Sequence, residues 1–222
     1  LSLDVSLSYV SSGFKVSEIA SPVGLGWMLN AGGVITRTVR GIPDETPRDG
    51  YYKCIQAHRN TDDAGYLIGS DEFDYYAKCI RGAIDLEPDV YNFNFPGYNG
   101  TFVFKVEDSE NYHPIIIPYQ DLSIQIVSKD PIDNGIKEFK ITTPNGHKYF
   151  FGTENYTENT TARGIFKYMG PQSFKTAWHL YKIEDLNGTE TIDFKYSPKK
   201  QDFSSNDEYY NGPTTTVLDP QI

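Results

Sequence analysis

Short runs in which apolar and polar residues alternate occupy most of this chain, and clusters of Gly, Pro and Asn separate them. In the first run, residues 1–9, Leu, Val and Tyr occupy the odd positions, and Ser and Asp occupy the even ones. A period of two residues is typical of a half-buried β-strand, because successive side chains point to opposite faces of the sheet. The pattern predicts an all-β fold.

Further runs with the same period are rich in the β-branched and aromatic residues that favour strands. Three connectors place Asn-Gly beside such runs, at Asn99-Gly100, Asn145-Gly146 and Asn187-Gly188. Both residues tolerate the left-handed backbone of tight hairpin turns. We therefore expect antiparallel hairpins in one curved sheet or in a β-sandwich-like arrangement. The expected strands are 1–9, 34–39, 90–95, 100–106, 113–117, 122–127, 136–142, 148–151, 178–184 and 189–196.

The expected domain covers residues 1–196, with a sub-boundary near 85–90, and residues 197–222 form an extended tail or linker. An acidic insertion is expected at 44–89, and its first part, residues 44–70, has few aliphatic repeats, which predicts a long surface loop. One short helix is expected at 71–81, because Ser70 is a good N-cap and apolar residues follow at helical spacing. Residues 152–173 are polar and predict a second long loop.

The most distinctive stretch surrounds Trp27, which has Gly24 and Gly26 before it and Gly32 and Gly33 after it. Glycine accepts positive φ and lets other groups approach the backbone closely. We expect a sharp turn that packs against the indole, so that Trp27 and Trp178 are core anchors. In the strand that follows, we expect Arg37 to face solvent or a carboxylate.

Charge and composition restrict the partners of the chain. The formal net charge is −10, and the longest basic run is Lys199-Lys200, so we expect no binding to nucleic acid. We also expect no membrane insertion within this segment, since no run approaches 18 apolar residues. Cys54 and Cys79 leave two alternatives open, a disulfide worth about 3 to 4 kcal/mol or two buried thiols.

Reaction centres are not evident in the sequence, and we expect no enzyme, cofactor or metal site. The four histidines, His58, His113, His147 and His179, are too widely spaced for a local zinc motif. Acidic loops at 60–63 and 206–208 offer oxygen ligands for Ca²⁺, but solvated turns explain them as well. Carboxylate pairs for glycoside hydrolysis are available, but any chain with 30 acidic residues offers such pairs. The candidate carboxylates for such a pair are Asp74, Asp85, Glu87, Asp89 and Glu184.

Several segments together resemble the N-terminal region of large bacterial Rhs/YD-repeat proteins, and they are similar to the entry region of the B-type shell subunits of insecticidal toxin complexes. The block around Trp27 is the most specific of them. The segments are LSY at 7–9, VGLGWML at 23–29, VITR at 34–37, DLEPD at 85–89 and AWHLYKI at 177–183, followed by Asn187-Gly188.

The resemblance implies a non-catalytic segment of an exported scaffold, in which a β-shell surrounds or precedes a C-terminal cargo or toxin. The chain does not begin with Met, and we expect it to be a fragment of a secreted or surface protein of a Gram-negative bacterium. Its expected partners are downstream parts of its own chain. The alternative is a carbohydrate-binding or adhesive β-module that binds glycan or another surface protein through exposed aromatic residues.

Overall fold

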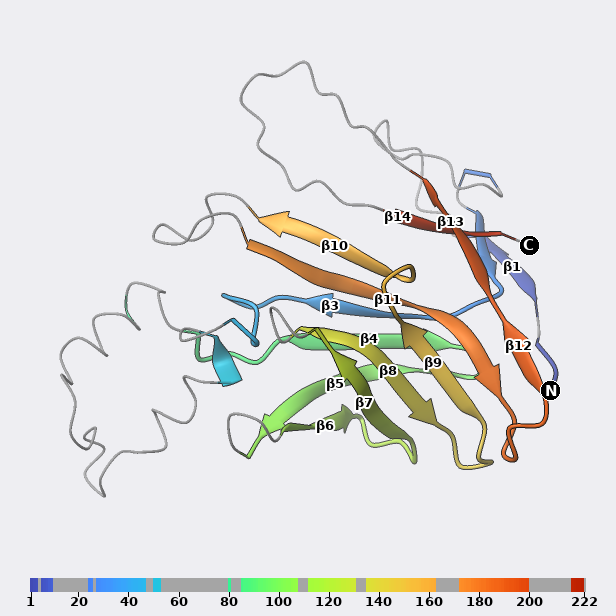
Figure 1. Ribbon diagram of the computed structural model, residues 1–222, viewed down its shortest axis with the longest axis horizontal. Coiled ribbons are helices and arrows are strands. Elements are labelled where there is room, and N and C mark those ends of the chain that lie inside the picture. Colours follow the sequence, from blue (N-terminus) through green and yellow to red (C-terminus); the bar gives the residue numbers. More distant parts are fainter. Residues whose placement is uncertain are drawn as a thin grey trace, which may run out of the picture.

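The computed structural model contains fourteen strands within the residues that it describes (Figure 1). Those residues are 1–3, 5–9, 24–25, 27–46, 50–52, 80, 85–107, 112–130, 135–162, 172–199 and 217–221. The strands before residue 120 are β1 (Ser6–Tyr9), β2 (Trp27–Asn30), β3 (Val34–Thr38), β4 (Val90–Phe95), β5 (Tyr98–Val106) and β6 (Tyr112–Ile117). The later ones are β7 (Ser123–Lys129), β8 (Ile136–Thr142), β9 (Lys148–Gly152), β10 (Thr157–Ala162), β11 (Gln172–Glu184), β12 (Thr191–Asp193), β13 (Lys195–Lys199) and β14 (Val217–Gln221).

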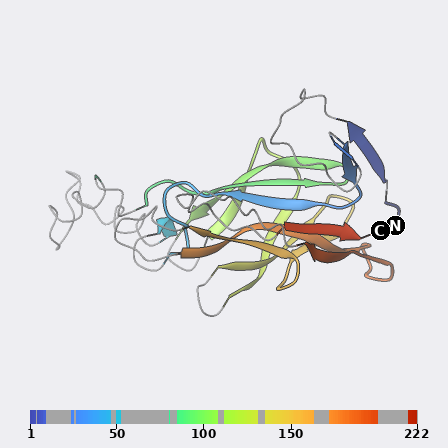
Figure 2. The same cartoon turned by 90° about the horizontal axis from the view of Figure 1, so that it is seen from above.

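Ten of these strands form one antiparallel sheet, which confirms the predicted all-β class. Its main path runs β6-β5-β4-β3-β11-β9-β8-β7, and β10 and β12 also pair with the long strand β11. The sheet curls until it is almost a closed barrel, so that its end strands β6 and β7 lie side by side (Figures 1 and 2). Two small ribbons, β1–β2 and β13–β14, lie outside this sheet.

The barrel stays open at a seam between β6 and β7, where the two strands form no ladder. Pro114 of β6 pairs with Phe104 of β5 and has no N–H to offer a second neighbour. On the other side of the seam, the pairing of β7 with β8 shifts register around Ser128, which bends the strand. A cavity of about 400 Å³ between the two strands is lined by Tyr112 to Pro114 and by residues 124–129.

Aromatic side chains fill the barrel because the inner face of each strand repeats every second residue. In β4, Tyr91, Phe93 and Phe95 are buried while Asn92 and Asn94 are exposed. Trp178 of β11 is fully buried, as expected for a core anchor. Its indole N–H donates to the Ile136 carbonyl at 2.9 Å, and its ring lies edge-on to Phe139 at 5.1 Å and packs near Tyr91.

Two of the three Asn-Gly pairs lie in turns as predicted, with Gly146 at φ 83° and Gly188 at φ 71°. The prediction for Asn99-Gly100 is wrong, because both residues lie within β5. The turn there is Pro96-Gly97, which joins the paired residues Phe95 and Tyr98. Gly100 instead lies opposite Phe93, whose ring would be 2.7 Å from any Cβ at that position.

Several boundaries differ from the prediction. Strand β10 lies inside the stretch predicted as a loop, because its polar residues pair along β11. The strand expected at 189–196 is divided into β12 and β13, which belong to different sheets. The tail contributes β14, which pairs with β13. The helix expected at 71–81 lies outside the described residues apart from Ile80, which is 87 % exposed.

The expectation that Trp27 is a core anchor is wrong. Trp27 is 41 % exposed and packs against Tyr9, whose ring centroid is 5.2 Å away. Within the part of the chain that the structure describes, β2 pairs with β1 alone, in a ribbon that stands off the barrel (Figure 2). A two-stranded ribbon by itself provides no second layer to bury its side chains. The expected close approach of glycine is present, since a Cβ on Gly24 would lie 3.2 Å from the indole ring.

A pair of glycines with the same backbone conformation tests the packing of the barrel. Gly97 has φ 82° and no atom within 4 Å of a Cβ position, so Gly97→Ala should cost about 1 kcal/mol of unfolding free energy from backbone strain alone. Gly152 has φ 99°, and its Cβ would lie 2.4 Å from the Lys137 carbonyl and 2.7 Å from the Trp178 ring. Gly152→Ala should therefore cost about 2 to 4 kcal/mol. Urea denaturation measures both, and equal costs would contradict the packing described here.

Candidate functional site

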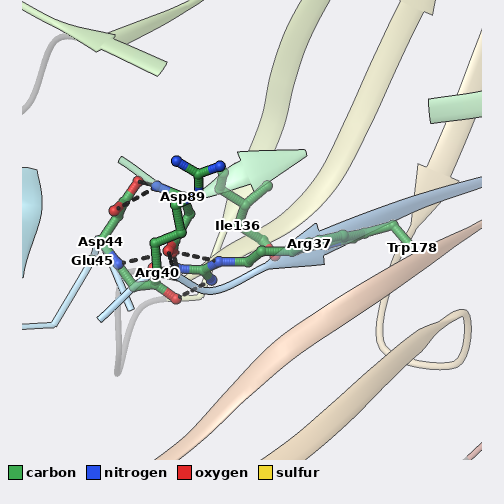
Figure 3. A network of polar contacts seen from close by, with 7 residues as sticks. All are labelled: Arg37, Arg40, Asp44, Glu45, Asp89, Ile136 and Trp178. Atoms are coloured by element: carbon green, nitrogen blue, oxygen red, sulfur yellow. Dashed lines mark hydrogen bonds and ion pairs between the residues drawn. The ribbon is translucent and has the colours of Figure 1, made fainter. Parts of the chain in front are cut away.

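A buried arginine is the centre of the main polar cluster in the barrel (Figure 3). The alternation of β3 turns Ile35 and Arg37 inward, so the guanidinium needs carboxylates inside the protein. Its Nε donates to Asp89 at 2.8 Å, and one terminal nitrogen donates to Glu45 at 2.8 Å. The other terminal nitrogen contacts both carboxylates. Of the two alternatives for Arg37, facing a carboxylate is confirmed.

Asp44 and Asp89 are joined by reciprocal hydrogen bonds, because the backbone N–H of each residue donates to the carboxylate of the other. The Asp89 N–H donates to both carboxyl oxygens of Asp44, at 3.1 and 3.2 Å, and the Asp44 N–H donates to the Asp89 carboxylate at 3.2 Å. The Arg40 N–H donates to the second Asp89 oxygen at 2.8 Å, while the Arg40 side chain points away from the cluster (Figure 3). These bonds fix the segment after β3 against the residue that precedes β4.

The described ends of the acidic insertion expected at 44–89 do not lie on the surface. Both ends of that segment enter the protein: Asp44 and Asp89 are fully buried, and Asp85 is only 5 % exposed. Tyr52 joins the hydrophobic core and stacks on Tyr112 with ring centroids 4.2 Å apart. The ends are buried because they connect β3 and β4, which are direct neighbours in the sheet.

Burial shifts the protonation equilibria of the cluster. Burial, and then repulsion from Asp89, raise the pKa of Asp44 to about 9, and burial raises the pKa of Asp85 to about 7. Burial alone would also raise the pKa of Glu45, but the Arg37 guanidinium outweighs it and holds that pKa below its ordinary value. The cluster therefore contains ion pairs around the Arg37 guanidinium, and beside them lie the Asp44 and Asp85 carboxyl groups, whose raised pKa favours the protonated form.

The chain should therefore be more stable at pH 5 than at pH 8. Asp85 and Asp44 keep protons in the folded state that they lose in the unfolded state once the pH exceeds about 4, so unfolding free energy falls as pH rises toward 7 and 9.

Urea midpoints across this range measure the slope. Asp85→Asn should make the slope below pH 7 shallower without removing it, because Asp44 still keeps its proton there. Asp185→Asn is the control, because hydrogen bonds from the N–H groups of Glu190 and Thr189 lower the pKa of Asp185. A midpoint that rises between pH 5 and 8 would contradict this.

The structure has a cavity at the seam and another beside the β1–β2 ribbon, and the carboxylates of the Arg37 cluster line neither of them. One cavity is the seam, and the other, of about 450 Å³, lies between the barrel and the β1–β2 ribbon. Its lining includes Asn30, Asn94, His179 and Tyr196. Of the candidate carboxylates, Asp89 is buried against Arg37 and Asp85 is buried beside Gly41, while Glu184 lies on β11 and contacts Lys182. Asp74 is outside the described residues.

The predicted structural residues do not converge on one place. Gly32 and Gly33 line the larger cavity, whereas Asn145, Gly146, Asn187 and Gly188 form turns elsewhere. Gly26, Cys54 and Cys79 lie outside the described residues, so the question of a disulfide stays open. Among the described residues no cluster of three metal-ligating side chains occurs, and no helix is long and apolar enough to span a bilayer.

Sequence reasoning missed the Arg37 cluster, although one signal was present. In an alternating strand, Arg37 shares its parity with the apolar Ile35, which places a charge on the inner face. A buried arginine requires carboxylates, but their positions 8 and 52 residues away cannot be derived from spacing.

Comparison of the chain with protein-family models, with curated proteins and with solved structures found no match.

Proposed function

We propose that this chain is a non-catalytic structural segment of a large exported protein of the Rhs/YD-repeat type, and that it belongs to a β-shell around or ahead of a C-terminal cargo. The observation that carries the proposal is the open seam of the barrel. Among the described strands, β6 and β7 each pair along one edge only, and an open strand edge offers N–H and C=O groups to further chain.

Exposed apolar side chains accompany the seam. Ile115 and Ile117 of β6 are 41 % and 53 % exposed, Val127 of β7 is 49 % exposed, and Tyr119 in the connection between them is 84 % exposed. We call these four residues the seam patch. Ile115 and Ile117 share the exposed face of β6, and apolar side chains that gather on one exposed face are typical of surfaces that another protein segment covers. In an acidic chain, these residues offer an uncharged surface for docking.

The partner that we propose is a downstream part of the same polypeptide, in the extracytoplasmic space of a Gram-negative bacterium. Support for this comes from the resemblance of the segments at 7–9, 23–29, 34–37, 85–89 and 177–183 to Rhs/YD-repeat proteins. The curled antiparallel sheet agrees with the wall that this resemblance implies.

The test has two parts. The full reading frame should contain repeated YD units followed by an unrelated C-terminal domain, and a frame that ends soon after Ile222 would refute the proposal. The following repeats, expressed as a separate chain, should then bind this one in a pull-down assay. Ile115→Lys with Ile117→Lys should abolish that binding. Leu86→Lys, a change of an equally exposed apolar residue away from the seam, should leave it intact.

A further inference from the structure

The larger cavity has a floor that strand register builds from separate parts of the chain. On the outer face of the barrel, His179 of β11 pairs with Val34 of β3, and Val34 pairs with Asn94 of β4. The adjacent row, one residue along each strand, is Trp178, Ile35 and Phe93, which belong to the core. Because side chains alternate between faces, a rigid core holds the polar floor from below.

The other walls come from the two ribbons. Ser6 and Asn30, paired in β1 and β2, form one wall, and Tyr196 of β13 forms another. The Tyr196 hydroxyl donates to the Leu180 carbonyl at 2.7 Å, and its ring centroid is 5.2 Å from that of His179. The His179 ring is held in turn by Glu158 at 2.8 Å. Two aromatic rings in the lining are thus fixed by hydrogen bonds.

Among the described residues of the lining there is no Asp, Glu, Lys or Arg, although the chain has 20 basic and 30 acidic residues. It offers amides, a hydroxyl, glycine backbone at Gly32, Gly33 and Gly97, and aromatic rings. Asn94 is exposed and makes no side-chain hydrogen bond to any residue that the structure describes, so its donor and acceptor are both available. Asn30 uses its amide nitrogen on Ser8 at 2.9 Å, which leaves its oxygen as an acceptor.

We propose that this cavity binds a neutral sugar residue. Neighbouring hydroxyl groups of a sugar match the paired donor and acceptor of an asparagine amide, and the apolar face of a sugar ring matches an aromatic wall. A lining whose described residues include no Asp, Glu, Lys or Arg offers little compensation for desolvating a phosphate, a carboxylate or an ammonium group, so neutral ligands should bind more tightly than charged ones. A volume of about 450 Å³ is within the range of small-molecule sites. This function is separate from the shell role, because the cavity and the seam share no lining residue.

The test uses the whole chain and ligand-observed NMR titrations with glucose, galactose, mannose, N-acetylglucosamine, cellobiose and lactose. At least one of these should bind saturably, and glucuronate and glucosamine should bind at least about tenfold more weakly than the best neutral sugar. Asn94→Ala should weaken binding about tenfold through loss of its hydrogen bonds. Asn92→Ala is the matched control, because Asn92 lies on the same face of β4 but outside the lining and should leave affinity unchanged.

Three results would overturn the proposal. One is the lack of saturable binding by any of the six neutral sugars to the wild-type chain. A second is glucuronate or glucosamine binding as tightly as the best of them. The third is binding that survives Asn94→Ala but is lost when Tyr9 and Trp27 are both changed to alanine, which would place the ligand on the exposed ring pair of the ribbon instead.

Discussion

Arg37→Leu should lower the free energy of unfolding by about 3 to 5 kcal/mol, because it leaves Asp89 and Glu45 buried without their cation. Urea denaturation at pH 7 measures the loss. Arg40→Leu is the matched control: it removes an exposed arginine three residues away, whose backbone N–H still reaches Asp89, and should cost about 0.5 kcal/mol or less.

A second variant separates the charge of Arg37 from its packing. If unpaired carboxylates cause the loss, then Arg37→Met combined with Glu45→Gln and Asp89→Asn should be more stable than Arg37→Met alone, because no buried charge remains. The reverse order would mean that the hydrogen bonds from the backbone N–H groups of Arg40 and Asp44 to the Asp89 carboxylate matter more than its charge, and it would contradict the electrostatic account.

Trp178→Ala should cost about 3 to 5 kcal/mol, because it opens a cavity among Tyr91, Phe139 and Gly152 at the centre of the barrel. Trp178→Phe keeps most of the apolar volume but leaves the Ile136 carbonyl unpaired, so about 1 to 3 kcal/mol is expected. The only other tryptophan supplies the control. Trp27→Ala should cost about 1 kcal/mol, since Trp27 is 41 % exposed.

Fluorescence gives an independent measurement of the same difference. In Trp178→Phe the remaining indole is Trp27, and its emission should be red-shifted and readily quenched by iodide. In Trp27→Phe the remaining indole is Trp178, which should resist quenching because it is fully buried. Equal quenching of the two variants would contradict the exposure assigned to these residues.

The local sequence pattern was sufficient to predict most strands of the barrel. The strands expected at 90–95 and 136–142 match β4 and β8 at both ends, because turn residues bound each of them. Strand β10 could not be found in this way. Its sequence Thr-Glu-Asn-Thr-Thr-Ala has no apolar face, and its pairing depends on the neighbouring strand β11.

The candidate sites could be predicted only in part. The period of β3 contains the information that Arg37 faces inward, but its partners Glu45 and Asp89 are brought together by the pairing of β3 with β4. The cavity floor is a stronger example, because His179 and Asn94 are 85 positions apart and become neighbours only through two strand registers. Register depends on the burial of whole strands, which no local motif records.

The sequence by itself determined the all-β class, most strands and the two Asn-Gly turns at 145–146 and 187–188, since these depend on side-chain periodicity and on local backbone preference. Tertiary structure decided which of the two tryptophans is buried. Trp178 is fully buried on a strand that pairs with neighbours on both sides, whereas Trp27 is 41 % exposed on β2, which among the described strands pairs with β1. The physical reason is that burial of a side chain requires a second layer of protein, and only the assembled sheet provides that layer.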